Sequence, residues 1–170
     1  NDDIEIKPVQ IKKNNTDVII GGTDNILCKY SQCCNPLPGD DVIGFITRGH
    51  GVSVHKKDCE NYLNAIKQGS NPERWVDVVW AEDAVKSDKT SFKVTLDIVS
   101  NESISLIADV TTVLAELRIP VTEIHSGQLK NGNCSLLVTI STAGVSQLNN
   151  ILIRLRKLSN VISVDRTIRT

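Results

Sequence analysis

Residues 28–59, with the sequence CKYSQCCNPLPGDDVIGFITRGHGVSVHKKDC, contain four of the five cysteines and two of the three histidines. Two β-rich runs in this stretch, residues 42–47 and 52–55, flank the segment RGHG at 48–51. A short glycine-containing segment between two such runs predicts a β-hairpin, here with an exposed cationic tip. The segment NPLPGD at 35–40 predicts a turn directly after the paired cysteines. The stretch therefore predicts a small module organised around one turn and one hairpin.

Three cysteines and one histidine of this stretch are of the types that zinc prefers as ligands. They are Cys33, Cys34, His55 and Cys59. His55 and Cys59 are four residues apart at an expected hairpin-to-helix junction, where both side chains can point the same way. Adjacent cysteines are not the common Cys-x-x-Cys pair, and their side chains diverge unless a turn, which Pro36 and Pro38 would supply, brings them together. The spacing therefore leaves two interpretations open, a structural zinc site and buried thiols that pack as small apolar groups.

Shorter signals predict the rest of this module, which we place at residues 18–80. Apolar runs at 18–20 and 75–80 are expected to be strands. Asp58 is a candidate N-cap for a helix through Lys67 that ends at Gly69. This helix is expected to turn three side chains inward, those of Tyr62, Leu63 and Ile66. Cys28 is a spare thiol that either joins the core or replaces Cys33 as a ligand.

The second half of the chain predicts a separate domain at residues 91–170. Residues 81–90, AEDAVKSDKT, are polar and poor in large apolar groups, so we expect a linker there. Residues 1–17 are expected to be a linker or a short strand. Downstream, hydrophobic periodicity gives the order β-α-β-β-α-β, which is the ferredoxin-like pattern. The fold class expected is α+β, a small zinc-finger-like α/β module followed by a ferredoxin-like domain.

The first helix of the second domain, expected from Ser103 to Leu117, has two apolar rows. One row contains Ile104 and Ile107, and the other contains Leu106 and Val110. Two rows are wider than the stripe needed to lie on one sheet. We therefore expect this helix to be covered on two sides.

Two sets of residues are candidates for binding. The first is cationic and lies in the cysteine-rich module: Lys29, Arg48, His50, Lys56 and Lys57. Cations on an exposed turn are usually only solvated, but glycines beside them let a phosphate backbone approach closely. No base-reading motif accompanies these cations, so the contact expected is recognition of a structured RNA by shape and charge.

The second set lies where the second domain's first strand meets its first helix: Asn101, Glu102, Ser103 and Ile104. Backbone N–H groups at a helix start favour an anion such as the carboxylate of an amino acid, and Glu102 is placed to face an ammonium group. An ordinary capping loop explains the same residues. Both interpretations stay open from the sequence.

Composition limits the possible functions of the chain. The net charge of the 170 residues is -1, so contact with a nucleic acid must come from a local basic patch. No apolar run approaches the roughly 18 residues of a membrane span, and an odd number of cysteines fits reduced thiols, so we expect a soluble, cytoplasmic protein. The absence of methionine suggests a piece of a longer protein. No nucleophile triad, phosphate loop or tuned carboxylate pair is visible, and we expect no enzymatic activity in this chain.

The segment CCNPLPGDDVIGFITRGHGVSVHKKDC and the β-α-β-β-α-β pattern downstream resemble the C-terminal regulatory region of long RelA/SpoT-type stringent-response proteins. That resemblance implies a zinc-finger or conserved-cysteine domain followed by an ACT domain. The (p)ppGpp synthetase and hydrolase domains would lie upstream. It also implies that the four candidate ligands hold the metal, which is zinc where it is present.

The resemblance implies partners as well. The cysteine-rich module would contact ribosomal RNA near bound deacylated tRNA and relay amino-acid starvation to the catalytic domains. ACT domains often form homodimers and bind amino acids at the interface, so an alternative function is a branched-chain amino-acid sensor. Here the loop reads NESISL where many amino-acid-binding ACT domains carry a glycine, which departs from that pattern.

Overall fold

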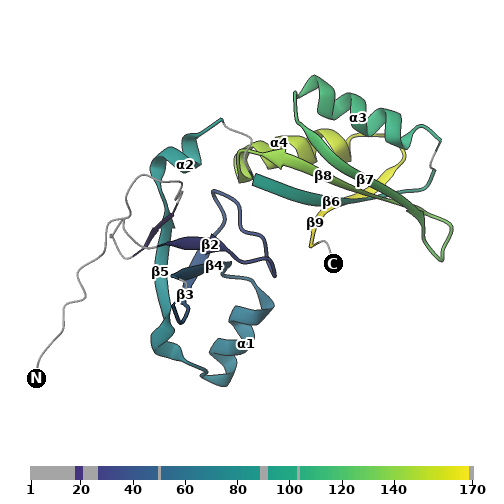
Figure 1. The fold of residues 1–170 in the computed structure, drawn as a ribbon. Coiled ribbons are helices and arrows are strands. Elements are labelled where there is room, and N and C mark those ends of the chain that lie inside the picture. The colour runs from purple at the N-terminus through teal and green to yellow at the C-terminus, as the bar shows by residue number, and fades with distance from the viewer. Residues whose placement is uncertain (1–17, 21–26, 50, 89–91, 103, 169–170) are drawn as a thin grey trace, which may run out of the picture. The chain divides into compact units, whose positions relative to one another are not determined.

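The computed structural model describes residues 18–20, 27–49, 51–88, 92–102 and 104–168 (Figure 1). The chain divides into two compact units, with the division between Ser87 and Asp88. The expected linker or strand at 1–17, together with His50 and Ser103, lies outside the described residues.

The first unit contains one five-stranded sheet with the strand order β1-β5-β3-β4-β2. Its strands are β1 (Val18–Ile20), β2 (Cys28–Tyr30), β3 (Val42–Ile46), β4 (Val52–Lys56) and β5 (Trp75–Trp80). The predicted hairpin is β3 and β4, which pair antiparallel, while β2 pairs parallel with β4. A cluster of buried valines forms the core: Val42, Val52, Val54 and Val78. The hairpin is therefore the centre of the unit.

Helix α1 (Glu60–Gln68) packs more lightly than the sequence predicts. None of its residues is buried, and Leu63 and Ile66 are about half exposed, so the expectation that they face inward is wrong. The expected cap at Asp58 is also wrong, because Cys59 takes the N-cap position without a side-chain hydrogen bond and Asp58 pairs with Lys56 at 3.4 Å. Gly69, at φ +64°, ends the helix as predicted.

The expected linker at 81–90 contains a helix, α2 (Glu82–Lys86), which belongs to the first unit. Its single buried residue is Ala84, so the polar composition of the stretch hid a short helical turn. A 3-10 turn, η1 (Pro72–Arg74), precedes β5.

The second unit confirms the ferredoxin-like order. Its elements are β6 (Phe92–Ser100), α3 (Leu106–Glu116), β7 (Val121–Gln128), β8 (Cys134–Thr142), α4 (Val145–Arg156) and β9 (Val161–Thr167). The antiparallel strands have the order β7-β8-β6-β9, and both helices lie on one face of the sheet (Figure 1). The mixed α+β class expected from the sequence is therefore confirmed.

Helix α3 buries one of its two apolar rows and only part of the other. Leu106, Val110 and Val113 of one row are buried, as is Leu114 of the other, whereas Ile107 is 44% exposed and Ile104, just before the helix, is 94% exposed. The expectation of cover on both sides is therefore not met within the described residues of this chain.

Candidate functional site

Four predicted ligands from three separate elements converge in the first unit. The Sγ atoms of the three cysteines and a ring nitrogen of the histidine lie within 4.8 Å of one another, in a cluster of Cys33, Cys34, His55 and Cys59. His55 Nδ1 lies 3.3 Å from Cys33 Sγ, 3.9 Å from Cys34 Sγ and 3.7 Å from Cys59 Sγ. Cys33 Sγ lies 4.0 Å from Cys34 Sγ and 3.5 Å from Cys59 Sγ. The donors therefore enclose one common point.

These separations match the edges of a zinc tetrahedron. With Zn–S bonds of about 2.3 Å and Zn–N bonds of about 2.0 Å, tetrahedral geometry puts two sulfurs about 3.8 Å apart and a sulfur and a nitrogen about 3.5 Å apart. The sulfur–sulfur distances of 3.5 and 4.0 Å lie close to that value. The sulfur–nitrogen distances of 3.3 to 3.9 Å do as well. Five of the six donor–donor distances are thus close to those of a zinc tetrahedron, and all six are within 4.8 Å.

A single backbone turn brings the adjacent cysteines together. Residues 32–34 form the turn, which closes where the N–H of Asn35 donates to the carbonyl of Ser31 at 2.9 Å. Asn35 then takes a left-handed conformation at φ +47°, which Asn tolerates better than most residues. This turn precedes Pro36, so the expectation that Pro36 and Pro38 would orient the cysteines is wrong.

The proline segment instead anchors the end of the turn to the sheet. The N–H of Leu37 donates to Asp40 Oδ2 at 2.7 Å, and the N–H of Asp40 donates to the Leu37 carbonyl at 2.9 Å. Trp80 Nε1 on β5 donates to the Asp40 carbonyl at 2.9 Å. Leu37 is fully buried. The predicted turn at 35–40 therefore exists, and it fixes the cysteine turn from behind.

Burial differs among the ligands and changes their acidity. Burial raises the pKa of the Cys34 thiol to about 12, although the backbone N–H of Lys56 donates to its sulfur at 3.3 Å and opposes the shift. Cys33 is exposed, and although partial burial acts to raise its pKa, hydrogen bonds to side chains such as Ser31 outweigh burial and lower it. Burial lowers the pKa of His55, which keeps the imidazole in the neutral form that binds metals.

A second layer orients the histidine. His55 Nδ1 faces the thiols, while Nε2 lies 3.5 Å from Ser53 Oγ on the same strand. A metal-binding histidine usually donates its other N–H to an oxygen, which fixes the ring orientation. The edge of the His55 ring also meets Trp75, with the ring centroids 5.5 Å apart. Sequence reasoning placed Trp75 on a strand but missed this contact, because pairing across strands is not visible in the sequence.

The hairpin tip is closed by its own hydrogen bonds. The N–H and the hydroxyl of Thr47 both donate to the Gly51 carbonyl, at 2.9 and 2.7 Å. The N–H of Val52 donates to the Leu27 carbonyl at 2.8 Å, which attaches the tip to the chain before β2. Arg48 is exposed on this tip. The tip therefore presents the Arg48 side chain from a fixed backbone.

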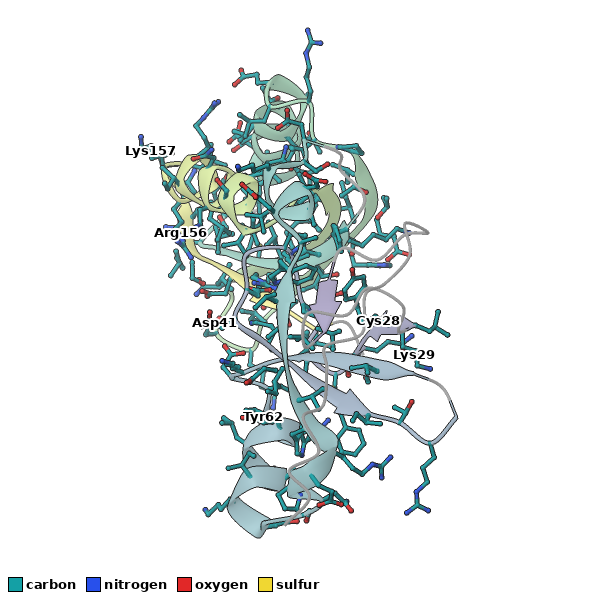
Figure 2. The ribbon with its side chains drawn as sticks, turned by 90° about the vertical axis from the view of Figure 1, so that its left-hand side faces the viewer. Cys28, Lys29, Asp41, Tyr62, Arg156 and Lys157 are labelled. Carbon is teal, nitrogen blue, oxygen red and sulfur yellow. The ribbon has the colours of Figure 1, made fainter. Side chains whose placement is uncertain are left out.

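The predicted RNA-binding cations separate into two places. Lys29 is exposed on β2 opposite Ser53, close to the tip that carries Arg48 (Figure 2). Lys56 and Lys57 lie at the far end of β4. There they line a cavity of about 530 Å³ whose other lining residues include Asp40, Asp41 and Asp58. The structure therefore does not bring the cations into one cluster, and carboxylates surround the pair at the far end.

The two remaining cysteines stay out of the cluster of four candidate ligands. Cys28 on β2 is half-buried against the valine core, and burial raises its pKa to about 11. Cys134 on β8 is half-buried and opposite Ser100, in agreement with a structural role. Cys28 is thus part of the core and does not replace a ligand.

The candidate amino-acid loop is mainly engaged with its own helix. Glu102 Oε1 accepts hydrogen bonds from the hydroxyl and N–H of Ser105, at 2.7 and 3.4 Å, just before α3. The N–H of Asn101 donates to the Asn160 carbonyl at 3.1 Å. Ile104 is 94% exposed. Amino-acid binding here stays a prediction, and Glu102 would have to leave Ser105 to meet an ammonium group.

Comparison with known proteins matches both units. Residues 18–81 match the family model described as the RelA/SpoT RIS domain, and residues 88–166 match the one described as the ACT domain. A GTP pyrophosphokinase from Haemophilus influenzae is 37% identical over 156 residues, which are 91% of this chain and 20% of that protein. One from Escherichia coli is 33% identical over 160 residues, which are 94% of this chain and 21% of that protein.

Among solved structures, the ACT domain of a GTP pyrophosphokinase from Chlorobium tepidum covers 48% of this chain and 100% of its own, with 21% identity and a TM-score of 0.40. The chain spans about a fifth of the length of the curated relatives. No helix among the described residues is long and apolar enough to cross a membrane.

The chain is thus a two-domain regulatory segment, with a RIS domain followed by an ACT domain. It belongs to the RelA/SpoT family and corresponds to the C-terminal regulatory region of those stringent-response proteins.

Proposed function

We propose that the chain is a non-catalytic regulatory region that contacts ribosomal RNA and deacylated tRNA through the hairpin tip of its RIS domain. It relays amino-acid starvation from there to upstream domains that make or degrade (p)ppGpp. The family match supports a regulatory role in the stringent response. The names of the relatives support a pyrophosphokinase as the whole protein.

The observation that carries the RNA contact is the rigid presentation of Arg48. Thr47 and Gly51 close the tip, Leu27 attaches it to β2, and Lys29 adds a second exposed cation beside it. A phosphate backbone is recognised by cations held at fixed positions, and a fixed backbone lowers the entropy lost on binding. Since the net charge is -1, such a local surface is what the contact requires.

Charge reversal tests this contact. We expect Arg48→Glu and Lys29→Glu to weaken binding of the chain to purified 70S ribosomes, most strongly at low salt, because each removes a cation and adds a repelling carboxylate. Lys67→Glu is the matched control, since Lys67 is an exposed cation of the same domain on α1 and not on the tip. Co-sedimentation at several salt concentrations measures the effect. Equal binding by all four proteins contradicts the proposal.

We also propose that the cysteine and histidine cluster holds zinc. Three thiols and an imidazole are a donor set that structural zinc sites use, and four protein ligands leave no open position for a substrate. Bound zinc would supply a cross-link between the 32–34 turn, β4 and the start of α1. The residues themselves provide the orientation, through Ser53 behind His55 and the Lys56 N–H on Cys34.

Metal analysis of protein purified without chelator or nickel resin tests the zinc site. We expect about one zinc per chain in the unaltered protein and a marked loss in Cys34→Ser, which removes one of four donors. Cys134→Ser is the matched control, because Cys134 is a half-buried thiol in the other unit. A clearly substoichiometric zinc content in the unaltered protein favours the packed-thiol interpretation.

A further inference from the structure

An aromatic group joins the metal cluster to the outer end of the hairpin. Trp75 is its centre, with ring centroids 4.6 Å from Phe45 on β3 and 4.8 Å from Tyr62 on α1. The Trp75 Nε1 atom is buried and has no hydrogen-bond partner among the described residues. Trp75 therefore supports its neighbours from within and does not present its own polar edge to a ligand.

Arg74 lies over this group and is held in place twice. Its Cζ atom lies 4.5 Å from the centroid of the Phe45 ring, within the range of a cation–π contact. Its Nε atom donates to the Ile46 carbonyl at 2.8 Å. The two contacts fix the guanidinium over the ring, and within the described part of the chain Arg74 has no ion pair with a carboxylate.

The Phe45–Arg74 pair adjoins the RNA-contacting tip. Phe45 pairs with Trp75 across the β3–β5 ladder, and Ile46, which accepts from Arg74, directly precedes the tip residue Thr47. Phe45 lies three residues before Arg48, and β3 ends between them at Ile46, so the two Cα atoms are at most about 10 Å apart. A single RNA strand can therefore reach both.

We propose that the guanidinium of Arg74, supported by the Phe45 ring, is a stacking platform for one unpaired nucleobase of the RNA whose phosphates Arg48 contacts. This inference rests on the RNA contact proposed above and adds an unpaired base to it. Unpaired bases in RNA stack on aromatic rings and on arginine planes, which need no particular base sequence. The guanidinium is planar and weakly hydrated, so it can lie between a ring and a base, whereas a lysine ammonium cannot.

Chemical probing of 70S ribosomes saturated with the chain tests the platform. We expect the unaltered protein to protect at least one unpaired base from base-specific reagents, next to nucleotides whose backbone it protects from hydroxyl radicals. Arg74→Lys keeps the charge but loses the plane. It should therefore abolish the base protection and retain the backbone protection, with affinity lowered at least about fivefold.

Phe45→Leu is the second variant, because it keeps an apolar support but removes the ring, and it should weaken the same base protection. Lys67→Arg is the control and should leave every protection unchanged. Base protection that survives in Arg74→Lys, or its absence with the unaltered protein, overturns the platform. If Arg48→Glu leaves ribosome binding unchanged, the RNA contact itself fails, which is a separate result from loss of the platform alone.

Discussion

At the scale of single residues, Gly51 controls the shape of the hairpin tip. Its φ is +77°, and a Cβ atom built there would lie 2.0 Å from the Leu27 carbonyl oxygen, which the tip needs as a hydrogen-bond acceptor. Gly49 has a similar φ of +79° but open space around its Cα. An alanine at residue 49 would therefore meet only the cost of the left-handed backbone, whereas an alanine at residue 51 would also clash with Leu27.

We predict that Gly51→Ala destabilises the first unit more than Gly49→Ala. Left-handed backbone alone costs an alanine roughly 1 to 2 kcal/mol, and the clash with Leu27 adds to that cost only at residue 51. Urea unfolding followed by tryptophan fluorescence measures both, since the two tryptophans lie in the first unit. Equal losses of unfolding free energy in the two variants would contradict the role assigned to Gly51.

Cys28 gives a prediction about alkaline pH. The pKa of its thiol is 9.0 when unperturbed and about 11 in the folded protein because of burial. Between these values the folded state keeps a proton that the unfolded chain has released. The stability that this proton provides is complete below pH 9 and is lost as the pH rises through about 11.

The expected result is that Cys28→Ala loses less unfolding free energy than the unaltered protein between pH 9 and 11. Urea titrations at a series of pH values measure the slope in each protein, so the cost of the substitution itself cancels. Cys134→Ala is the control and should keep the steep slope. Identical slopes in all three proteins would count against a buried, neutral Cys28.

The four candidate ligands could be named from the sequence, but the geometry that brings them together could not be predicted from it. The residue types and the four-residue interval from His55 to Cys59 predict a metal site. The turn that converges Cys33 and Cys34 depends on a backbone bond from Asn35 to Ser31, which no residue type signals. The contact between Arg74 and the Phe45 ring was likewise not predicted, because it joins two segments that are far apart in the sequence.

At the scale of elements, α1 is the part of the first unit that a metal at the proposed site would stabilise most. None of its residues is buried, and it is attached through Cys59 at its N-terminus, through a side-chain hydrogen bond from Asn61 to Cys33 and through Tyr62 against Trp75. The strands β3, β4 and β5 have a buried valine core of their own. Loss of the metal should therefore release the helix before the sheet.

We predict that a zinc chelator raises the hydrogen-exchange rate of the α1 amides much more than that of β3 and β4. The physical reason is that a nine-residue helix without buried residues is marginal in water by itself. Mass-spectrometric exchange with and without chelator measures this, and Cys59→Ser should resemble the chelated protein. Exchange in α1 that is unaffected by chelator would favour thiols that merely pack together.

Element types were easier to predict than their packing. Alternating apolar residues identified the strands of the second unit, where one face of each strand is buried. The apolar side of α1 led to a wrong prediction. Leu63 and Ile66 lie at helical spacing and suggested a buried face, but both side chains are about half exposed. Periodicity reports that a face is apolar, and it cannot report whether this chain covers it.

At the scale of the whole molecule, the two units are stabilised in different ways. The ferredoxin-like unit has a continuous core of its own, which includes Leu96, Val138 and Leu155. The hairpin unit combines a small valine core with the Cys33, Cys34, His55 and Cys59 cluster at one end of β4 and a cationic tip at the other. Zinc at the proposed site would fix the base of the hairpin, while hydrogen bonds between Thr47 and Gly51 fix the tip.

The salt dependence of ribosome binding is the most direct test of the claim that Arg48 contacts phosphate. We predict that Arg48→Gln lowers the slope of log association constant against log salt concentration by about one, since one phosphate contact fewer releases about one counterion fewer. Lys67→Gln should keep the slope of the unaltered protein. The same slope and the same affinity in all three proteins would contradict the claim.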